Sequence, residues 1–190
     1  MKIVLASASP RRRDILTMAG LRDFEIRPAG RTEILPPGIA PGAAVERLAG
    51  QKCAEVAARY DSETVVIASD TVVAIDGMIL GKPAGAAEAA EMLRRLSGRT
   101  HRVYSGLAVA CRGETVVEHE ETAVTFRALT DREIAAYVAT GEPLDKAGAY
   151  GIQGKGGIFV EGISGDYYNV MGLPLCRLGL ILRRLGVDLI

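Results

Sequence analysis

Four charged side chains occupy positions from which they could bind a phosphorylated ligand. Asp70 interrupts the apolar run VVIASDTVVAI, and a carboxylate buried there would need a charge partner, hydrogen bonds or a metal. Lys52 falls on the apolar stripe of a helix expected at about 42–60, and Arg12 has apolar residues three, four and seven positions further on. Lys82 stands in a loop between a glycine and a proline. Inward-facing cations beside one acid suit a polyphosphate and a divalent cation, which together account for both signs of charge.

Each of these residues also has an ordinary structural interpretation. Asp70 could end a strand and satisfy a turn, Lys52 could extend its ammonium group to water, and Lys82 could be an exposed loop lysine. A set of purely structural ion pairs would also explain the four residues together. The residues alone leave these alternatives open.

Three consecutive arginines, 11–13, follow the letters SASP at the start of a helix expected over 10–19. Ser9 is expected to be the N-cap of this helix. A helix N-terminus carries partial positive charge, so acidic residues are normally favoured there. The arginines therefore indicate either a tolerated surface penalty or an anion that binds at this helix end. Of the three, Arg13 is expected to meet solvent.

A glycine-rich segment, DKAGAYGIQGKGG, is a further candidate for ligand binding. Six residues before Lys155 stands Ala149, so the segment does not match a Walker A phosphate loop. It does not match GxGxxG either, because Phe159 takes the place of the last glycine. The segment could hold Gln153 near a ligand, or it could be a plain tight turn.

The cysteines and histidines do not indicate a metal centre. Cys53, Cys111 and Cys176 are far apart and odd in number, which argues against a zinc site or a disulfide framework. Each stands among apolar residues and is expected to be a buried thiol, so we expect a reducing, cytoplasmic setting. His101 and His119 lie in strand-like segments without a relay partner in sequence, and we assign them no catalytic role.

Bulk properties limit the class of protein. The chain has 190 residues, 48% of them hydrophobic and 5% aromatic, which suits one domain or two intimate lobes with an aliphatic core. Lysine plus arginine and aspartate plus glutamate both number 23, so general binding to nucleic acid or to an anionic membrane is not indicated. The N-terminal apolar run is too short for a signal peptide, and arginines interrupt the apolar C-terminal segment, which we expect to be an amphipathic helix.

The apolar patterns predict an α/β fold with a mixed sheet rather than a regular βαβ repeat. Strands are expected at 2–6, 64–68, 101–111, 115–127 and 157–162, with a hairpin around Asp76-Gly77. Helices are expected at 10–19, about 42–60, 84–96, from a TDRE capping box at 130–133 to before Gly141, and at the C-terminus.

The whole chain resembles the Maf family of nucleoside triphosphate pyrophosphatases. The motifs that carry the resemblance are, in order, LASASPRRRDIL, ASDTVV, LGKP, LSGRTHRVYSG, TFRAL, EPLDKAGAYGIQGKGG and YYNVMGLPL. The resemblance implies a single Maf-like domain over 1–190, with an elongated mixed sheet flanked by helices and two lobes around a deep cleft. Such a fold is similar to that of the inosine triphosphate pyrophosphatases. It also implies a small-molecule nucleotide substrate and, often, a homodimer, and we expect no nucleic-acid or membrane partner on the charge balance given above.

The implied activity is hydrolysis of a nucleoside triphosphate between the α and β phosphates. The products are a nucleoside monophosphate and pyrophosphate, and the substrates implied here are dTTP, UTP and modified uridine triphosphates. A divalent metal is implied, expected to be Mg²⁺, with Mn²⁺ and Co²⁺ as alternatives. The cellular role would be house-cleaning of the nucleotide pool. A nucleotide-binding regulator of cell division or septum formation, with little hydrolysis, is the alternative.

The resemblance also assigns roles to individual residues. Asp70 would be the catalytic acid or base. Phosphates would be contacted by Ser7, Arg12, Lys52 and Lys82. The metal would be held by Asp70 and by Glu33, in a segment, GRTEILPPG, where Thr32 replaces an aspartate common in the family.

Three further positions divide the family by base, and here they read Arg11, Thr71 and Gln153, the dTTP/UTP pattern. In the family branch that acts on 7-methyl-GTP, the residues at these positions are Trp, Gln and Glu. A glutamine amide can match the N3–H donor and O4 acceptor of uracil or thymine, although a flipped amide would also accept cytosine. Arg11 would repel the cationic 7-methylguanine ring.

Overall fold

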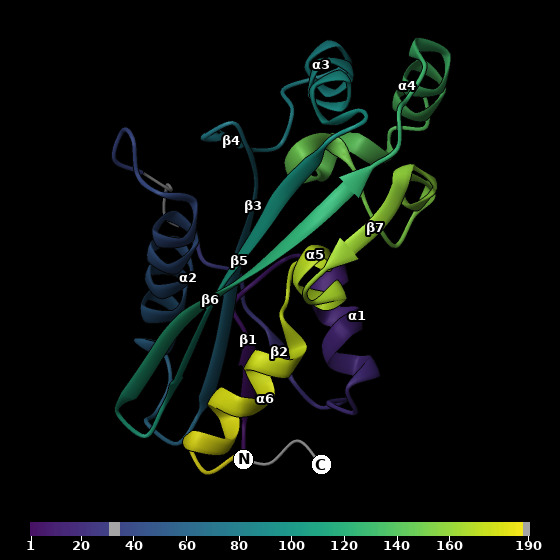
Figure 1. Cartoon of the computed structure of the whole chain (residues 1–190). Coiled ribbons are helices and arrows are strands. Elements are labelled where there is room, and N and C mark those ends of the chain that lie inside the picture. The colour runs from purple at the N-terminus through teal and green to yellow at the C-terminus, as the bar shows by residue number, and fades with distance from the viewer. Residues whose placement is uncertain (31–34, 188–190) are drawn as a thin grey trace. The chain divides into compact units, whose positions relative to one another are not determined.

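A computed structural model of the chain describes residues 1–30 and 35–187, which form helices around a seven-stranded sheet (Figure 1). The strands are β1 (Ile3–Leu5), β2 (Glu25–Ile26), β3 (Val65–Ile75), β4 (Met78–Leu80), β5 (Thr100–Cys111), β6 (Glu114–Phe126) and β7 (Val160–Ser164). The α-helices are α1 (Pro10–Met18), α2 (Pro41–Ala57), α3 (Ala86–Leu96), α4 (Asp131–Val138), α5 (Tyr167–Met171) and α6 (Leu175–Arg184). Three short 3-10 turns lie at Glu142–Asp145, Ala147–Ala149 and Lys155–Phe159.

The sheet is mixed, as the sequence predicts. Its order is β2-β1-β3-β5-β6-β7, and β4 pairs with β3 off this path. Strand β1 pairs in parallel with β2 and β3, whereas β4 and β7 run antiparallel to their neighbours β3 and β6. The α/β class is therefore confirmed.

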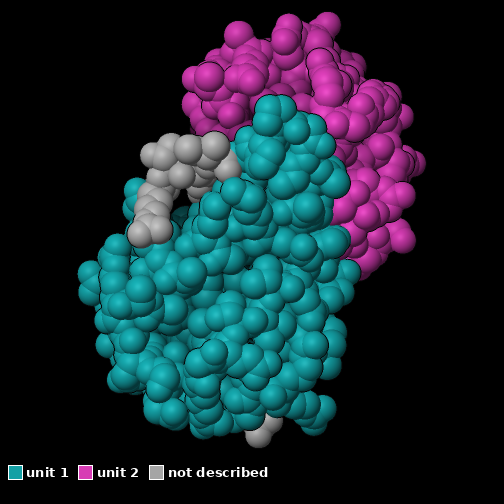
Figure 2. All heavy atoms as spheres, turned by 90° about the vertical axis from the view of Figure 1, so that its left-hand side faces the viewer, with its two compact units in different colours: residues 1–70, 105–120, 172–190 teal, residues 71–104, 121–171 magenta. Residues whose placement is uncertain are grey.

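The chain divides into two compact units, coloured separately in Figure 2. Unit 1 comprises Met1–Asp70, Ser105–Glu120 and Gly172–Ile190, and unit 2 comprises Thr71–Tyr104 and Glu121–Met171. Strands β3, β5 and β6 each contribute residues to both units. The expected single domain with two lobes around a deep cleft stays a prediction.

In unit 1, helices lie on both sides of β1, with α2 on one side and α1 and α6 on the other (Figure 1). Strand β1 is wholly apolar and buried for this reason. Successive side chains point to opposite faces of a strand, so alternate residues meet α2. The cluster on that side comprises Val4, Ala6, Ala49, Cys53, Val56, Val66, Ala68 and Ala108. Gly106 lets β5 approach α2 closely, because a Cβ there would lie 2.1 Å from the carbonyl oxygen of Val45.

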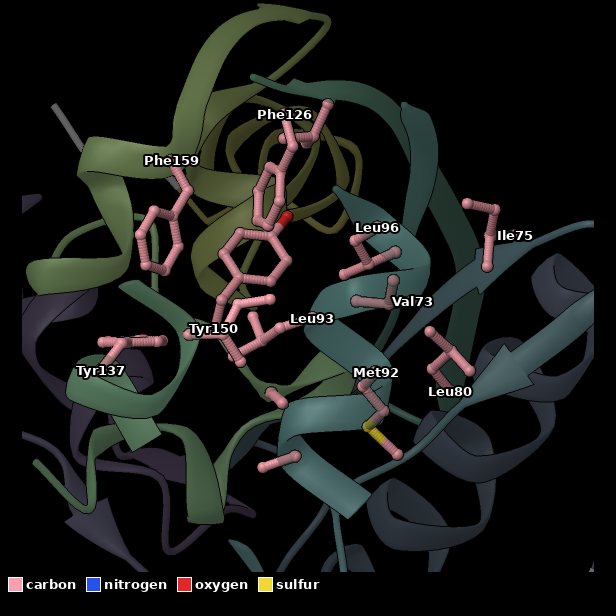
Figure 3. Close-up of a cluster of buried hydrophobic side chains, with 14 of the residues drawn as sticks. Val73, Ile75, Leu80, Met92, Leu93, Leu96, Phe126, Tyr137, Tyr150 and Phe159 are labelled. Carbon is pink, nitrogen blue, oxygen red and sulfur yellow. The ribbon is translucent and has the colours of Figure 1, made fainter. Parts of the chain in front are cut away.

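Unit 2 has its own core, in which aromatic rings gather beside the apolar face of α3 (Figure 3). The rings of Phe126 and Tyr150 meet edge to face, with centroids 4.7 Å apart, which is a favoured aromatic geometry. His101 is buried in the same cluster, and its Nε2 lies 2.8 Å from the Tyr150 hydroxyl. Burial lowers the pKa of His101 to about 4, so the imidazole is neutral at physiological pH. This histidine is a buried core residue.

Local signals predicted several element boundaries correctly. Ser9 occupies the N-cap position of α1, and the capping box at Thr130 and Glu133 is present with both of its reciprocal hydrogen bonds. The hairpin turn at Asp76-Gly77 has two positive φ values, 51° and 74°, as expected for a two-residue turn with the twist of its strands.

Two expectations are wrong. Strand β3 does not stop at residue 68 but continues to Ile75, so Asp70 lies inside the strand and is not a turn residue at its end. Cys53 and Cys111 are buried, but Cys176 is exposed, because its position on α6 faces away from the buried residues of that helix.

Within residues 1–30 and 35–187, no helix is both long and apolar enough to cross a membrane.

Candidate active site

The junction between β1 and α1 brings Ser7 and Arg12 together. Ser7 follows the buried strand and is itself buried. The Arg12 side chain turns inward and donates two hydrogen bonds, from Nη1 to Ser7 Oγ at 3.0 Å and from Nε to the Gly172 carbonyl at 2.8 Å. The inward orientation expected for Arg12 is therefore confirmed. By contrast, Arg13 is exposed and pairs with its neighbour Asp14, as expected for a surface charge.

The Gly172 carbonyl links this junction to the middle of β3. Besides the bond from Arg12, it accepts a hydrogen bond of 2.9 Å from the buried Ser69 hydroxyl. Ser69 directly precedes Asp70 in β3. A single carbonyl therefore fixes Arg12 and the strand position next to the predicted catalytic acid.

Asp70 itself is paired with Lys52. The Lys52 ammonium nitrogen lies 2.5 Å from Asp70 Oδ1, and the two side chains are only 18% and 14% exposed. Lys52 reaches this position because α2 packs its buried stripe, including Ala49 and Cys53, against the sheet. Lys52 is thus directed to an acid inside unit 1 and does not merely extend to water.

These contacts form a continuous chain within unit 1. Ser7 contacts Arg12, Arg12 and Ser69 share the Gly172 carbonyl, and the next residue of β3 pairs with Lys52. The arrangement connects two cations, two buried hydroxyl groups and one carboxylate, and it begins at the N-terminus of α1, whose N–H groups favour an anion. Such a set can bind phosphate oxygens through its cations and hydroxyl groups.

Sequence reasoning missed Ser69 and Gly172. Both lie inside motifs that carry the family resemblance, ASDTVV and YYNVMGLPL. A hydroxyl and a backbone carbonyl are uncharged, so neither stands out from its neighbours as a charged residue in an apolar run does. Their partners are 103 and 160 residues away in sequence, so no local pattern could have identified them.

The remaining predicted residues are described by their positions in the fold. Lys82 is exposed in the loop before α3, Thr71 follows Asp70 within β3, and Gln153 is exposed in the glycine-rich loop, all three in unit 2. Arg11 is half-buried in the first turn of α1. Glu33 lies outside the described residues. The roles assigned to these five residues stay predictions.

The donor chemistry at Asp70 is compatible with Mg²⁺. Among the described residues, no group of three or more His, Cys, Asp or Glu side chains is arranged to hold a metal ion. Mg²⁺ does not need such a cage, because it usually binds to one or two carboxylates, to substrate phosphates and to water. One carboxylate in a site suited to phosphates therefore fits the ion.

Comparison with known proteins decides the family. A family model described as "Maf-like protein" matches residues 2–185. This chain belongs to the Maf family. A Maf relative from Moorella thermoacetica, named dTTP/UTP pyrophosphatase, is 54% identical over 98% of this chain and 96% of its own length. A Bacillus cereus relative of the same name is 50% identical over 98% of this chain and 97% of its own.

Among solved structures, a nucleoside-triphosphatase or dITP/XTP pyrophosphatase from Mycobacterium abscessus covers 66% of this chain and 73% of its own. Its sequence identity is 22% and its TM-score 0.42, a likeness too distant to support a conclusion about this Maf chain.

Proposed function

We propose that this Maf protein hydrolyses dTTP and UTP, and modified uridine triphosphates, to the monophosphate and pyrophosphate. The observation that carries the proposal is the 54% identity, over nearly the whole of both chains, to a relative named dTTP/UTP pyrophosphatase. The residues Arg11, Thr71 and Gln153 support the choice of base, because they match the dTTP/UTP pattern of the family. The expected consequence for the cell is removal of surplus or non-standard pyrimidine nucleotides.

In this proposal Asp70 positions or activates the attacking water. Its carboxylate accepts a hydrogen bond from the attacking water and either orients it or takes its proton, in line with the α-phosphorus. Lys52 holds one oxygen of the carboxylate in a fixed position. An ammonium group has three donors, so Lys52 can hold Asp70 and contact a phosphate oxygen in the same complex.

The cations stabilise the negative charge that develops on the leaving pyrophosphate. Arg12 is already oriented by Ser7 and Gly172, so its guanidinium needs little reorganisation when the triphosphate binds. Ser7 and the N-terminus of α1 would contact the same phosphates, and Lys82 would add a further cation. Electrostatic stabilisation by fixed groups is the principal source of catalysis in phosphoryl transfer.

The divalent metal of the proposal would be held by Asp70 together with Glu33, and Mg²⁺ is the expected ion. When bound, it would neutralise phosphate charge and polarise the bond that is cleaved. The proposal further includes a cytoplasmic setting and a homodimer, of which the second can be tested by light scattering on the purified protein.

The proposal is tested by incubating the purified chain with Mg²⁺ and each of dTTP, UTP, CTP, ITP, GTP and 7-methyl-GTP. The expected result is pyrophosphate and monophosphate from dTTP and UTP, and little product from ITP, GTP and 7-methyl-GTP. The rate with CTP shows whether a flipped Gln153 amide admits cytosine. Orthophosphate as the product, or a preference for ITP, would contradict the proposal. The alternative of a regulator with little hydrolysis is not favoured by the relatives' names, and it predicts nucleotide binding without product. Replacing Mg²⁺ by Mn²⁺ or Co²⁺ identifies the preferred ion.

A further inference from the structure

One carboxylate binds the backbone of the glycine-rich loop in unit 2. Glu142 accepts a hydrogen bond of 3.0 Å from the Lys155 N–H through Oε2 and one of 3.2 Å from the Gly156 N–H through Oε1. The Tyr137 hydroxyl donates to Glu142 Oε1 at 2.8 Å and accepts a hydrogen bond of 3.1 Å from the Gly151 N–H. Glu142 and Tyr137 therefore bind the loop on both sides of Gln153.

The segment between these anchors is a tight turn. The Gly154 N–H donates to the Gly151 carbonyl at 3.1 Å, which closes a turn with Gln153 at its third position. The Gln153 side chain is exposed, whereas Gly151 and Gly156 at the two anchors are buried. The turn thus presents one amide side chain outward from a backbone that is held from within.

The same anchors explain why the loop is rich in glycine. A Cβ at Gly154 would lie 2.4 Å from Glu142 Oε1, and one at Gly156 would lie 2.7 Å from the Tyr137 hydroxyl oxygen. A side chain at either position would have to displace Glu142 or Tyr137 from these hydrogen bonds. In a phosphate loop, backbone N–H groups surround a bound anion. Here the N–H groups of Lys155 and Gly156 are already taken by the protein's own carboxylate, so this loop is not built to hold a phosphate.

Glu142 is itself held in place. Its backbone carbonyl accepts a hydrogen bond of 2.6 Å from Lys146 Nζ, which also binds Asp145 at 2.6 Å. Burial alone would raise the pKa of Glu142, but the hydrogen bonds from Lys155, Tyr137 and Gly156 outweigh burial and the pKa is lowered. The carboxylate is therefore ionised at neutral pH and accepts charge-assisted hydrogen bonds.

We propose that Glu142 and Tyr137 are positioning residues that fix the turn carrying Gln153 and thereby set the selectivity for the base. This inference depends on the proposed role of Gln153 as the residue that binds the N3–H and O4 edge of uracil or thymine. Hydrogen bonds select between bases only if the side chain that makes them is held near its binding geometry. A glycine-rich turn without anchors would sample many backbone conformations, so Gln153 would meet the base in few of them.

Binding measurements on the full chain test the inference independently of turnover. The ligands are α,β-methylene-UTP, which resists cleavage between the α and β phosphates, and its N3-methyl derivative, which lacks the N3–H donor. The quantity of interest is the ratio of the two Kd values. We expect Gln153→Ala to reduce the preference for the unmethylated base about tenfold, which corresponds to the loss of about one good hydrogen bond. We expect Glu142→Gln to reduce it by a similar factor, because an amide NH₂ cannot accept a hydrogen bond from a backbone N–H.

A double variant separates positioning from general damage. If Glu142 acts through Gln153, adding Glu142→Gln to Gln153→Ala leaves the Kd ratio where Gln153→Ala had put it. Tyr137→Phe removes only a hydroxyl group, and we expect a smaller fall of about threefold, so this variant keeps the test decisive should Glu142→Gln fail to fold. The matched control is Glu133→Gln, another carboxylate of unit 2 that accepts a backbone N–H, whose loss should lower stability without changing the ratio.

An unchanged Kd ratio in Glu142→Gln and Tyr137→Phe overturns the inference, and so does an equal fall in Glu133→Gln. If Gln153→Ala leaves the Kd ratio unchanged, Gln153 does not contribute to selection of the base, and the inference also fails. If the wild-type chain discriminates between the two ligands but releases no pyrophosphate from UTP, the inference stands and the proposed hydrolysis is wrong.

Discussion

The Lys52 ammonium nitrogen lies 2.5 Å from a carboxylate oxygen of Asp70, which connects helix α2 to the middle of strand β3. Both side chains are largely buried, so neither charge is well solvated. A buried ion pair costs desolvation energy that its mutual attraction only partly recovers, and it is weak evidence for a purely stabilising role. A carboxylate held by a cation, and connected through Ser69 and Gly172 to a residue proposed to bind phosphate, is instead what the proposed reaction requires.

Removal of the Asp70 charge is expected to slow turnover strongly. Asp70→Asn keeps the shape of the side chain but loses its capacity to orient or deprotonate water. We expect kcat for UTP to fall by about 10²–10⁴-fold, as is typical for loss of one acid-base or charge-stabilising group. Release of pyrophosphate at saturating UTP measures the effect. The same change at Asp76, an exposed carboxylate of the β3–β4 hairpin, should leave kcat unchanged, and equal activity of the two variants would refute the role of Asp70.

Removal of Lys52 is expected to destabilise the fold. Lys52→Met leaves the Asp70 carboxylate buried without its cation, and breaking a buried pair in this way costs about 3 kcal/mol. The double variant Lys52→Met with Asp70→Asn removes both charges and should recover most of the lost stability. Urea unfolding of the wild type, both single variants and the double variant gives the coupling free energy. Additive effects of the two substitutions would show that the pair is not coupled.

The buried His101 makes stability depend on pH. Burial lowers its pKa in the folded state from 6.5 to about 4, so the unfolded chain binds a proton that the folded chain does not. Stability is therefore full above about pH 6.5 and falls as the pH is lowered toward 4. Between pH 7 and pH 5 we expect a loss of about 2 kcal/mol in the free energy of unfolding.

His101→Gln should remove this part of the pH dependence, because an amide can still bond to the Tyr150 hydroxyl but does not titrate. Urea unfolding at both pH values compares the two proteins. Carboxylates affect stability only at lower pH values than His101 does. The hydrogen bond from Lys2 lowers the pKa of Glu25 from 4.5 to about 2, so the stabilisation provided by the ionised Glu25 is lost only below pH 4.5. An equal pH dependence in wild type and His101→Gln would contradict the assignment.

The three cysteines should differ sharply in reactivity. Burial raises the pKa of Cys53 to about 12, so almost no thiolate forms at neutral pH, and Cys111 is also buried. Cys176 is exposed on α6 and should react. Titration of the native protein with a disulfide reagent is expected to detect about one thiol per chain, and all three of the thiols in urea. Cys176→Ser should abolish the native reaction, and fast labelling of that variant would contradict the description of Cys53 and Cys111.

Charges in apolar surroundings were the part of the site that sequence could predict. Arg12, Lys52 and Asp70 each interrupt a helical or strand pattern, and the structure joins all three to one chain of contacts in unit 1. The length of β3 was not predicted, because aspartate is unfavourable in strands and was interpreted as a strand end. Lys52 overrides that local preference, but its contact with Asp70 depends on the packing of α2 against the sheet.

Uncharged and backbone partners were beyond local reasoning. The Gly172 carbonyl meets Arg12 and Ser69 only because the chain returns to unit 1 after completing unit 2. No local pattern singles out Glu142, and the glycines that accommodate it match neither a Walker A loop nor GxGxxG. Their spacing is explained by the side chains that occupy the adjacent space.

The division of unit 1 into three segments determines the order in which the protein can mature on the ribosome. Synthesis proceeds from the N-terminus, and unit 2 has all of its residues once Met171 has emerged. Unit 1 begins first but waits for the segment that starts at Gly172, which supplies the carbonyl for Arg12 and the helix α6. A nascent chain halted before residue 172 would carry Asp70, Lys52 and Arg12 but lack the carbonyl that links Arg12 to Ser69, the neighbour of Asp70. Translation therefore postpones assembly of the candidate active site until all of unit 2 has been synthesised.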